Sequence, residues 1–316
     1  MIKSENKVSL EFADIEKANT ILTTNDEYVQ SMHPYEWSLK MQVSQEISKE
    51  RYFAFLTKNI LEWNKNEKIF LKTVINKLNI KLAEHKINIC ENIVFIKTTG
   101  HEEWNCAYTR SNAIILPERK LNSNNDKIAI LRLISHEFFH ILTRRYPKLK
   151  SVLYAIIGFQ KIENSELLLP EKLKQKTLTN PDSPINDHYI TIMHNGNTAH
   201  VTPITLLKNQ LANVDTSQDI IESLETHLLV LDKKSDKWNI KMIDKQPCVF
   251  DIKHLEGNEY FDISGKIFEP EEILAECFVN LLVTNQEPPF SKIIRQMKDN
   301  LSYFFDSKET TCRVEF

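Results

Sequence analysis

Apolar residues recur at spacings of three and four through the N-terminal part of the chain. From Val43 to Leu82, isoleucine, leucine, valine and phenylalanine follow this period, and neither proline nor glycine interrupts it. Such a period is typical of an amphipathic helix. We therefore predict that residues 1–88 form a helical section, with one or two long helices between Val43 and Leu82.

The pattern changes near residue 90. A continuous apolar run at Asn92–Ile96 predicts a short buried strand, and residues 106–110 and 113–116 predict a strand pair. The next segment, Ile128–Leu142, is apolar on nearly every side, which a helix tolerates only when it is buried. Residues 89–160 are therefore predicted to combine a small sheet with a buried helix.

The second half of the chain alternates between turn and strand patterns before it becomes helical again. Residues 161–187 read as a loop, in which Asn180-Pro181-Asp182-Ser183-Pro184 is strong turn chemistry. Residues 188–262 read as β structure, with Asn195-Gly196 predicting a hairpin turn. Residues 263–316 read as a C-terminal helical section, in which Pro270 and the glutamates after it are typical of a helix start.

Composition narrows the fold class. Only 5 of the 316 residues are glycine, whereas usage in proteins is roughly 7%. So few glycines argue against a dinucleotide-binding fingerprint or a P-loop, and they favour a fold rich in helices. Together with the strand patterns, this predicts one compact two-lobed α+β unit with a helical N-terminal section, a small mixed sheet, a β-rich insertion and C-terminal helices.

Charge and cysteine content bear on partners and compartment. The chain has 40 basic and 43 acidic residues, a net charge of −3, which favours neither nucleic acid nor an anionic membrane as a partner. The N-terminus lacks the apolar segment of a secretory signal, and no apolar run is long enough for a transmembrane helix. The five cysteines are scattered and form no CxxC pair, which indicates free thiols. We expect a cytoplasmic location in the producing cell, with signal-less secretion left open, and the sequence leaves the oligomeric state undetermined.

The buried helix carries an HExxH motif, from His136 through Glu137 to His140. Residues four apart lie one above the other on a helix, so both imidazoles can face one metal ion. Glu137 lies beside them and can reach a water on that ion, whose pKa zinc lowers towards about 7. Two histidines and a glutamate in apolar surroundings are costly unless they are paired or ligated. The motif therefore predicts one zinc ion per chain, although a His/His/Glu set can also hold another divalent metal.

A catalytic zinc site needs a third protein ligand. The third histidine of the metzincin pattern is missing, because Thr143 and Tyr146 stand where its glycine and histidine would be. A later helix offers two acids, Glu272 and Glu276, which are four apart and share a face. One of them can bind the metal while the other holds a histidine N–H. Acids in the first turn of a helix also stabilise the helix through its dipole, so these glutamates could have that structural role alone.

HExxH followed by such a glutamate helix resembles the gluzincin zinc metallopeptidases. Uncharacterised bacterial zincin-like proteins are similar over more of the chain, including the segments Ala107–Arg110, His136–Arg144 and Pro270–Ala275 and the Asn-Pro-Asp-x-Pro loop. The resemblance implies His136 and His140 as ligands, Glu137 as general base, Glu272 as third ligand and Glu276 as the residue that orients a ligand histidine. The chain departs from familiar gluzincins in the 132 positions from His140 to Glu272, much of which reads as β structure.

Further residues are candidates for substrate handling. Peptide hydrolysis needs a donor for the developing oxyanion, and Tyr260 is our first candidate for this catalytic role. In gluzincins the strand before the active helix, here Cys106–Leu116, often pairs with the substrate backbone. Within this segment Arg110 could hold a substrate carboxylate and Tyr108 is another oxyanion candidate, which makes both candidate substrate-binding residues. Each of these three side chains also has an ordinary structural reading, as a half-buried tyrosine or the partner of a surface acid.

The predicted function is hydrolysis of a peptide bond in a peptide or protein substrate, by zinc-activated water with Glu137 as general base. Two alternatives remain open at this stage. The same metal centre could cleave an amide that is not a peptide, or the chain could be a non-catalytic zincin-like binding protein. Glu137 argues against a purely structural zinc site, which would not need that carboxylate.

Overall fold

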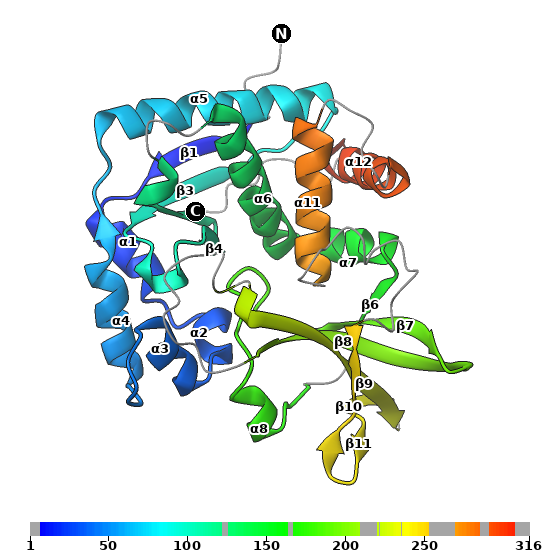
Figure 1. The fold of residues 1–316 in the computed structure, drawn as a ribbon. Helices are drawn as coiled ribbons and strands as arrows, with labels where there is room; N and C mark the ends of the chain where they lie inside the picture. The colour runs from blue at the N-terminus through cyan, green and yellow to red at the C-terminus, as the bar shows by residue number, and fades with distance from the viewer. Residues whose placement is uncertain are drawn as a thin grey trace. The chain divides into compact units, whose positions relative to one another are not determined.

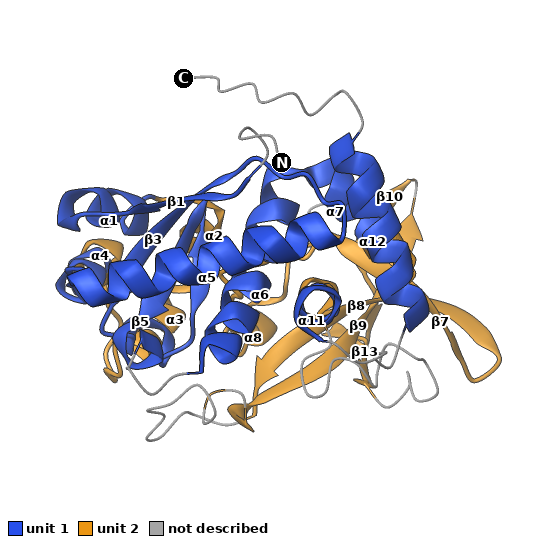
Figure 2. Ribbon diagram, turned by 90° about the horizontal axis from the view of Figure 1, so that it is seen from above, with its two compact units in different colours: residues 1–24, 53–153, 275–316 blue, residues 25–52, 154–274 orange. Residues whose placement is uncertain are grey.

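The computed structural model describes residues 7–121, 126–163, 167–208, 220, 222–234, 236–252, 269–284 and 291–306. The chain divides into two compact units, each built from segments distant in sequence (Figure 2). Unit 1 contains Met1–Thr24, Phe53–Leu153 and Ala275–Phe316, and unit 2 contains Asn25–Tyr52 and Tyr154–Leu274. The division into five sections, 1–88, 89–160, 161–187, 188–262 and 263–316, stays a prediction. The two units follow a different division, because unit 1 contains parts of both the first and the last section.

Unit 1 is built on a five-stranded mixed sheet of order β1-β3-β5-β4, with β2 paired to β3 (Figure 1). Strands β1, β3 and β5 are parallel, whereas β4 and β2 run antiparallel to their neighbours. The apolar runs of β3 and β5 are buried along almost their whole length, as expected for the interior of a parallel array. The bounds are β1 Ser9–Phe12, β2 Ile60–Leu61, β3 Asn92–Thr98, β4 Tyr108–Arg110 and β5 Ala113–Pro117.

Helices cover this sheet. The 20-residue α5 and the 19-residue α6 pack against each other and against the sheet. Asn64 and Glu67 form a reciprocal capping box that starts α5, and the Asp126 carboxylate accepts the Ile128 N–H at the start of α6. The helices that lie wholly or partly in unit 1 are α1 (Ile15–Leu22), α4 (Lys49–Lys58), α5 (Lys65–Glu84), α6 (Lys127–Arg145), α7 (Pro147–Ile156), α11 (Pro270–Val283) and α12 (Ser291–Asp306), with short 3-10 turns η1 (His101–Glu103) and η2 (Glu118–Leu121).

Unit 2 is built on a six-stranded antiparallel sheet of order β10-β9-β8-β7-β6, with β13 also paired to β9. Ile162, Leu231 and Trp238 form an apolar cluster in this unit. The predicted hairpin turn is confirmed, since Asn195 and Gly196 join β7 to β8 with φ of 50° and 75°. The elements are α2 (Glu27–Ser31), α3 (Pro34–Lys40), β6 (Phe159–Lys161), α8 (Glu171–Lys174), β7 (His188–His194), β8 (Asn197–Leu207), β9 (Leu224–Lys234), β10 (Lys237–Ile240), β11 (Met242–Ile243), β12 (Gln246–Pro247) and β13 (Val249–Asp251).

The predicted α+β class and mixed sheet are confirmed, and the described part of residues 1–88 contains five helices, but the two short strands among them were not predicted. Ser9–Phe12 is a strand, because it pairs in parallel with β3, more than eighty residues later in the chain. Ile60–Leu61 also forms a strand, which separates α4 from α5 by pairing with the end of β3. Such short strands owe their conformation to partners distant in sequence, and a four-residue run leaves little periodic signal of its own. Within the described residues, no helix is both long and apolar enough to cross a membrane.

Candidate metal centre

Helix α6 holds the three residues of the motif, two of them buried and one partly exposed. His140 has no exposed surface and Glu137 is only 3% exposed, whereas His136 is half-buried. The centroids of the two imidazole rings lie 4.8 Å apart. The two histidines therefore lie on one face of the helix, as expected for residues four apart.

Helix α11 carries the third residue. Its first five residues belong to unit 2 and the rest belong to unit 1. Within unit 1 it contacts α6 through the Phe139 and Phe278 rings, whose centroids lie 5.6 Å apart, and Arg132 Nη2 donates to Glu276 Oε1 at 2.7 Å. Because α11 is one continuous helix, these contacts also set the position of Glu272, one turn before Glu276.

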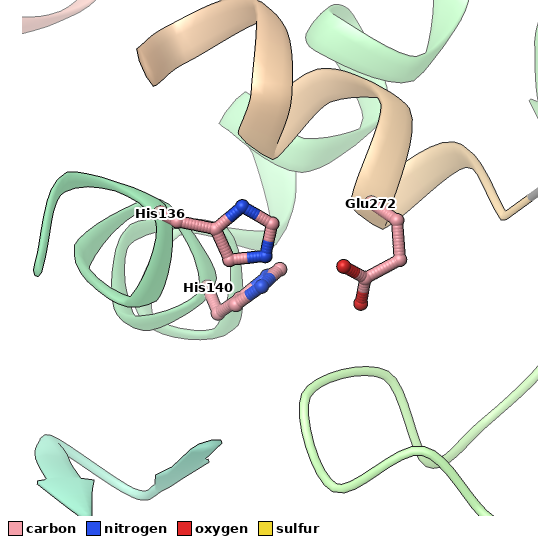
Figure 3. A group of neighbouring side chains, drawn as sticks. All are labelled: His136, His140 and Glu272. Carbon is pink, nitrogen blue, oxygen red and sulfur yellow. The ribbon is translucent and has the colours of Figure 1, made fainter. Parts of the chain in front are cut away.

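The structure brings His136, His140 and Glu272 together. One ligand atom from each residue lies within 4.8 Å of the other two. Figure 3 shows both imidazole rings and the Glu272 carboxylate directed towards a common region. Two imidazoles and one carboxylate match the ligand set of one type of catalytic zinc site, so these side chains fit the predicted ion.

The neighbouring acids of α11 have other partners. Glu276, 41% exposed at its side chain, pairs with Arg132 and also accepts from Asn280 Nδ2 at 3.4 Å. Glu271 is fully buried and accepts a hydrogen bond from the Tyr154 hydroxyl at 2.5 Å. Burial, followed by the charge of Glu271, raises the pKa of Tyr154 well above its ordinary value. The geometry thus favours Glu272 over Glu276 as the third ligand. That Glu276 orients a ligand histidine stays a prediction, and the ion pair of Glu276 with Arg132 does not support it.

The predicted substrate-handling residues lie in different settings. Tyr108 and Arg110 belong to β4, which is the last strand in the order of the unit 1 sheet, and both are 2% exposed. The Arg110 guanidinium donates to the backbone oxygens of Leu22 and Thr24, at 3.5 and 3.0 Å. These contacts give Arg110 a structural role, and its role towards substrate stays a prediction. Tyr260 lies outside the described residues.

Sequence analysis missed Asn180, which contacts Glu272, and Thr205, which contacts the nearby Glu269. Asn180 Nδ2 donates to Glu272 Oε1 at 2.8 Å and to Glu269 Oε2 at 2.9 Å. Thr205 Oγ1 also donates to Glu269, at 2.8 Å. Burial, and after it the charge of Glu272, raises the pKa of Glu269, while the bonds from Asn180 and Thr205 act in the opposite direction. Asn180 begins the Asn-Pro-Asp-x-Pro loop, which the sequence identified as a turn. Nothing in the sequence indicated that this turn contacts the third ligand.

A pocket of about 390 Å³ lies in unit 2, and Asn180 and Glu269 are among its lining residues. Apolar side chains contribute much of the lining, including Leu178, Ile204 and Leu229. This volume is at the lower end of the range for small-ligand pockets, roughly 300–1,000 Å³. Asn180, which donates to Glu272, therefore also borders a space that can receive an apolar group.

Comparison with known proteins assigns no family or function to the chain. The functional interpretation depends on the chemistry of the described side chains, chiefly His136, His140 and Glu272. No family model, curated protein or solved structure matches the chain.

Proposed function

We propose that the chain is a zinc-dependent metallopeptidase with a zincin-like core, in which His136, His140 and Glu272 hold one zinc ion. A single observation carries the proposal: ligand atoms from residues 132 positions apart in sequence come within 4.8 Å of one another. His136 and His140 are fixed by the helix period, but the approach of Glu272 depends on tertiary packing. A chance HExxH sequence would have no reason to meet a third ligand of the right type.

Glu137 supplies the acid and base chemistry in this proposal. A zinc ion, when bound, lowers the pKa of a coordinated water and polarises the carbonyl of the scissile amide. The buried Glu137 carboxylate, next to His136 on α6, accepts a proton from the attacking water and delivers it to the leaving nitrogen. A carboxylate that shuttles one proton in this way has a catalytic role that a structural zinc site would not require.

One feature of unit 2 supports a peptide as the substrate. In unit 2, the pocket beside Asn180 and Glu269 offers apolar contacts for a side chain. The near balance of charge gives no reason to propose a nucleic acid or membrane partner.

The proposal is tested first by metal content and then by activity. We expect about one zinc per chain, by mass spectrometry of protein purified without added metal. A library of peptides and a set of small non-peptide amides would then be incubated with the zinc-loaded protein. Cleavage confined to the small amides would replace the peptidase assignment with another amide hydrolase, and failure to take up zinc or any other divalent metal would refute the metal centre itself.

A further inference from the structure

We infer that Asn180 is a positioning residue that orients the Glu272 carboxylate for metal binding. The inference rests on the proposed function, and it concerns a residue outside the HExxH motif and outside the glutamate helix. All the contacts that support it lie within unit 2. It also gives the Asn-Pro-Asp-x-Pro loop a function beyond that of a turn.

Every polar group of the Asn180 side chain is engaged. Its Oδ1 accepts the backbone N–H of Asp182 at 2.9 Å, the hydrogen bond of an Asx turn. Its Nδ2 donates one hydrogen to Glu272 at 2.8 Å and the other to Glu269 at 2.9 Å. Only the NH₂ end of an amide can donate to two carboxylates, so the chemistry of the partners fixes the orientation of the amide.

The loop that carries Asn180 is itself anchored at the preceding residue. Glu36 of α3 is 1% exposed, and its two carboxylate oxygens accept the N–H of Thr179 at 2.7 Å and its hydroxyl at 2.9 Å. The same Glu36 accepts the backbone N–H of His33 at 3.0 Å as part of the α3 capping box. The residue before Asn180 is thus held by α3, and the second partner of Asn180, Glu269, is held by Thr205 of β8.

This framework has a direct consequence for Glu272. A glutamate side chain has three rotatable bonds, and ordering it for one ion has an entropic cost. Asn180 holds one Glu272 oxygen in place before the ion arrives and also separates two neighbouring carboxylates that would otherwise repel each other. Such groups behind a ligand typically change metal affinity by about 10- to 100-fold when they are removed.

The test is the Asn180→Ser variant of the full-length chain. Serine retains an oxygen that can accept the Asp182 N–H but lacks the NH₂ group that reaches the two carboxylates. The dissociation constant for Zn²⁺ would be measured by competition with a chelator, and the visible absorption of bound Co²⁺ would report on the ligand geometry. We expect zinc binding about 10- to 100-fold weaker than in the wild type and a changed Co²⁺ spectrum.

Asn186→Ser is the matched control. Asn186 lies in the same loop, donates to the Pro203 carbonyl at 2.5 Å and accepts from the Thr202 hydroxyl at 2.7 Å, but neither bond involves an acid. We expect this variant to lose stability and keep the zinc affinity and Co²⁺ spectrum of the wild type. An equal loss of zinc affinity in both variants would overturn the inference, because general loosening of the loop would then explain the effect.

Thr179→Val covers the case in which Asn180→Ser fails to fold. Valine removes the hydroxyl that donates to Glu36 but keeps the N–H, so we expect a smaller loss of zinc affinity in the same direction. Wild-type affinity in every variant that folds would overturn the role of Asn180 and leave the metallopeptidase proposal intact. Absence of zinc binding in the wild type would instead refute the proposed function, and the inference with it.

Discussion

At the residue scale, Glu137 separates metal binding from catalysis. Its carboxylate is 3% exposed and is not one of the three proposed ligands. One of its oxygens also lies within 4.8 Å of ligand atoms of His140 and Asp182, a second group of side chains that could hold a metal. We predict that Glu137→Ala keeps about one zinc per chain and loses activity by about 10²- to 10⁴-fold, the range for removing a general acid or base. Zinc content and peptide cleavage would be measured on the same preparation. Activity that survives in a pure sample of this variant would exclude Glu137 as the general base.

The two acids of α11 offer a matched pair of substitutions. Glu272→Gln removes the charge of the third ligand, so we expect zinc to be lost from protein purified without added metal. Glu276→Gln removes only a half-exposed ion pair with Arg132, which should change the free energy of unfolding by less than about 1 kcal/mol and leave zinc in place. Metal content and urea unfolding of the two variants, side by side, would distinguish these roles. If zinc were lost from the Glu276 variant and kept in the Glu272 variant, Glu276 would be the third ligand in place of Glu272.

At the element scale, the contact between α6 and α11 sets the position of Glu272. Phe139 and Phe278 are both fully buried where the two helices meet. We predict that Phe278→Ala lowers the free energy of unfolding by about 3–5 kcal/mol, as expected for truncating a buried aromatic ring. Zinc affinity should fall as well, because the helix that carries Glu272 loses its contact with the HExxH helix.

Phe305→Ala is the control for this prediction. Phe305 is buried on α12 and packs on Tyr146 at a centroid distance of 5.4 Å, a contact that involves neither α11 nor a proposed ligand. It should lower stability without a change in zinc affinity at temperatures where the variant remains folded. Equal loss of zinc affinity in both variants would mean that global stability, rather than the position of α11, governs binding.

At the scale of the whole molecule, the metal centre should couple zinc binding to folding. The ligands come from two helices far apart in the sequence, so the unfolded chain cannot present them together. Zinc at 100 times its dissociation constant should therefore stabilise the native state by about 2.7 kcal/mol. Thermal unfolding with zinc and with a chelator would measure this shift. The Glu272→Gln variant should show little or none of it, and a full shift in that variant would place the zinc elsewhere.

The sequence by itself determined the elements whose signals are local. The predicted buried helix, the strands around Asn92–Ile96 and Ala113–Leu116, and the Asn195-Gly196 turn are all present. Each depends on a helix period, an apolar run or a turn preference that acts over a few neighbouring residues. The facing imidazoles of His136 and His140 are local in the same sense, because the helix period alone places them together.

Tertiary structure decided what depends on partners far away in the chain. The sequence left Glu272 and Glu276 as alternatives because both lie on one face of a helix, whereas packing gives the first to the histidines and the second to Arg132. The strand at Ser9–Phe12 and the contact of Asn180 with Glu272 were likewise unforeseen, since each depends on a partner more than eighty residues away. The period of a helix fixes which side chains share a face, but only the packing of the whole chain fixes what that face meets.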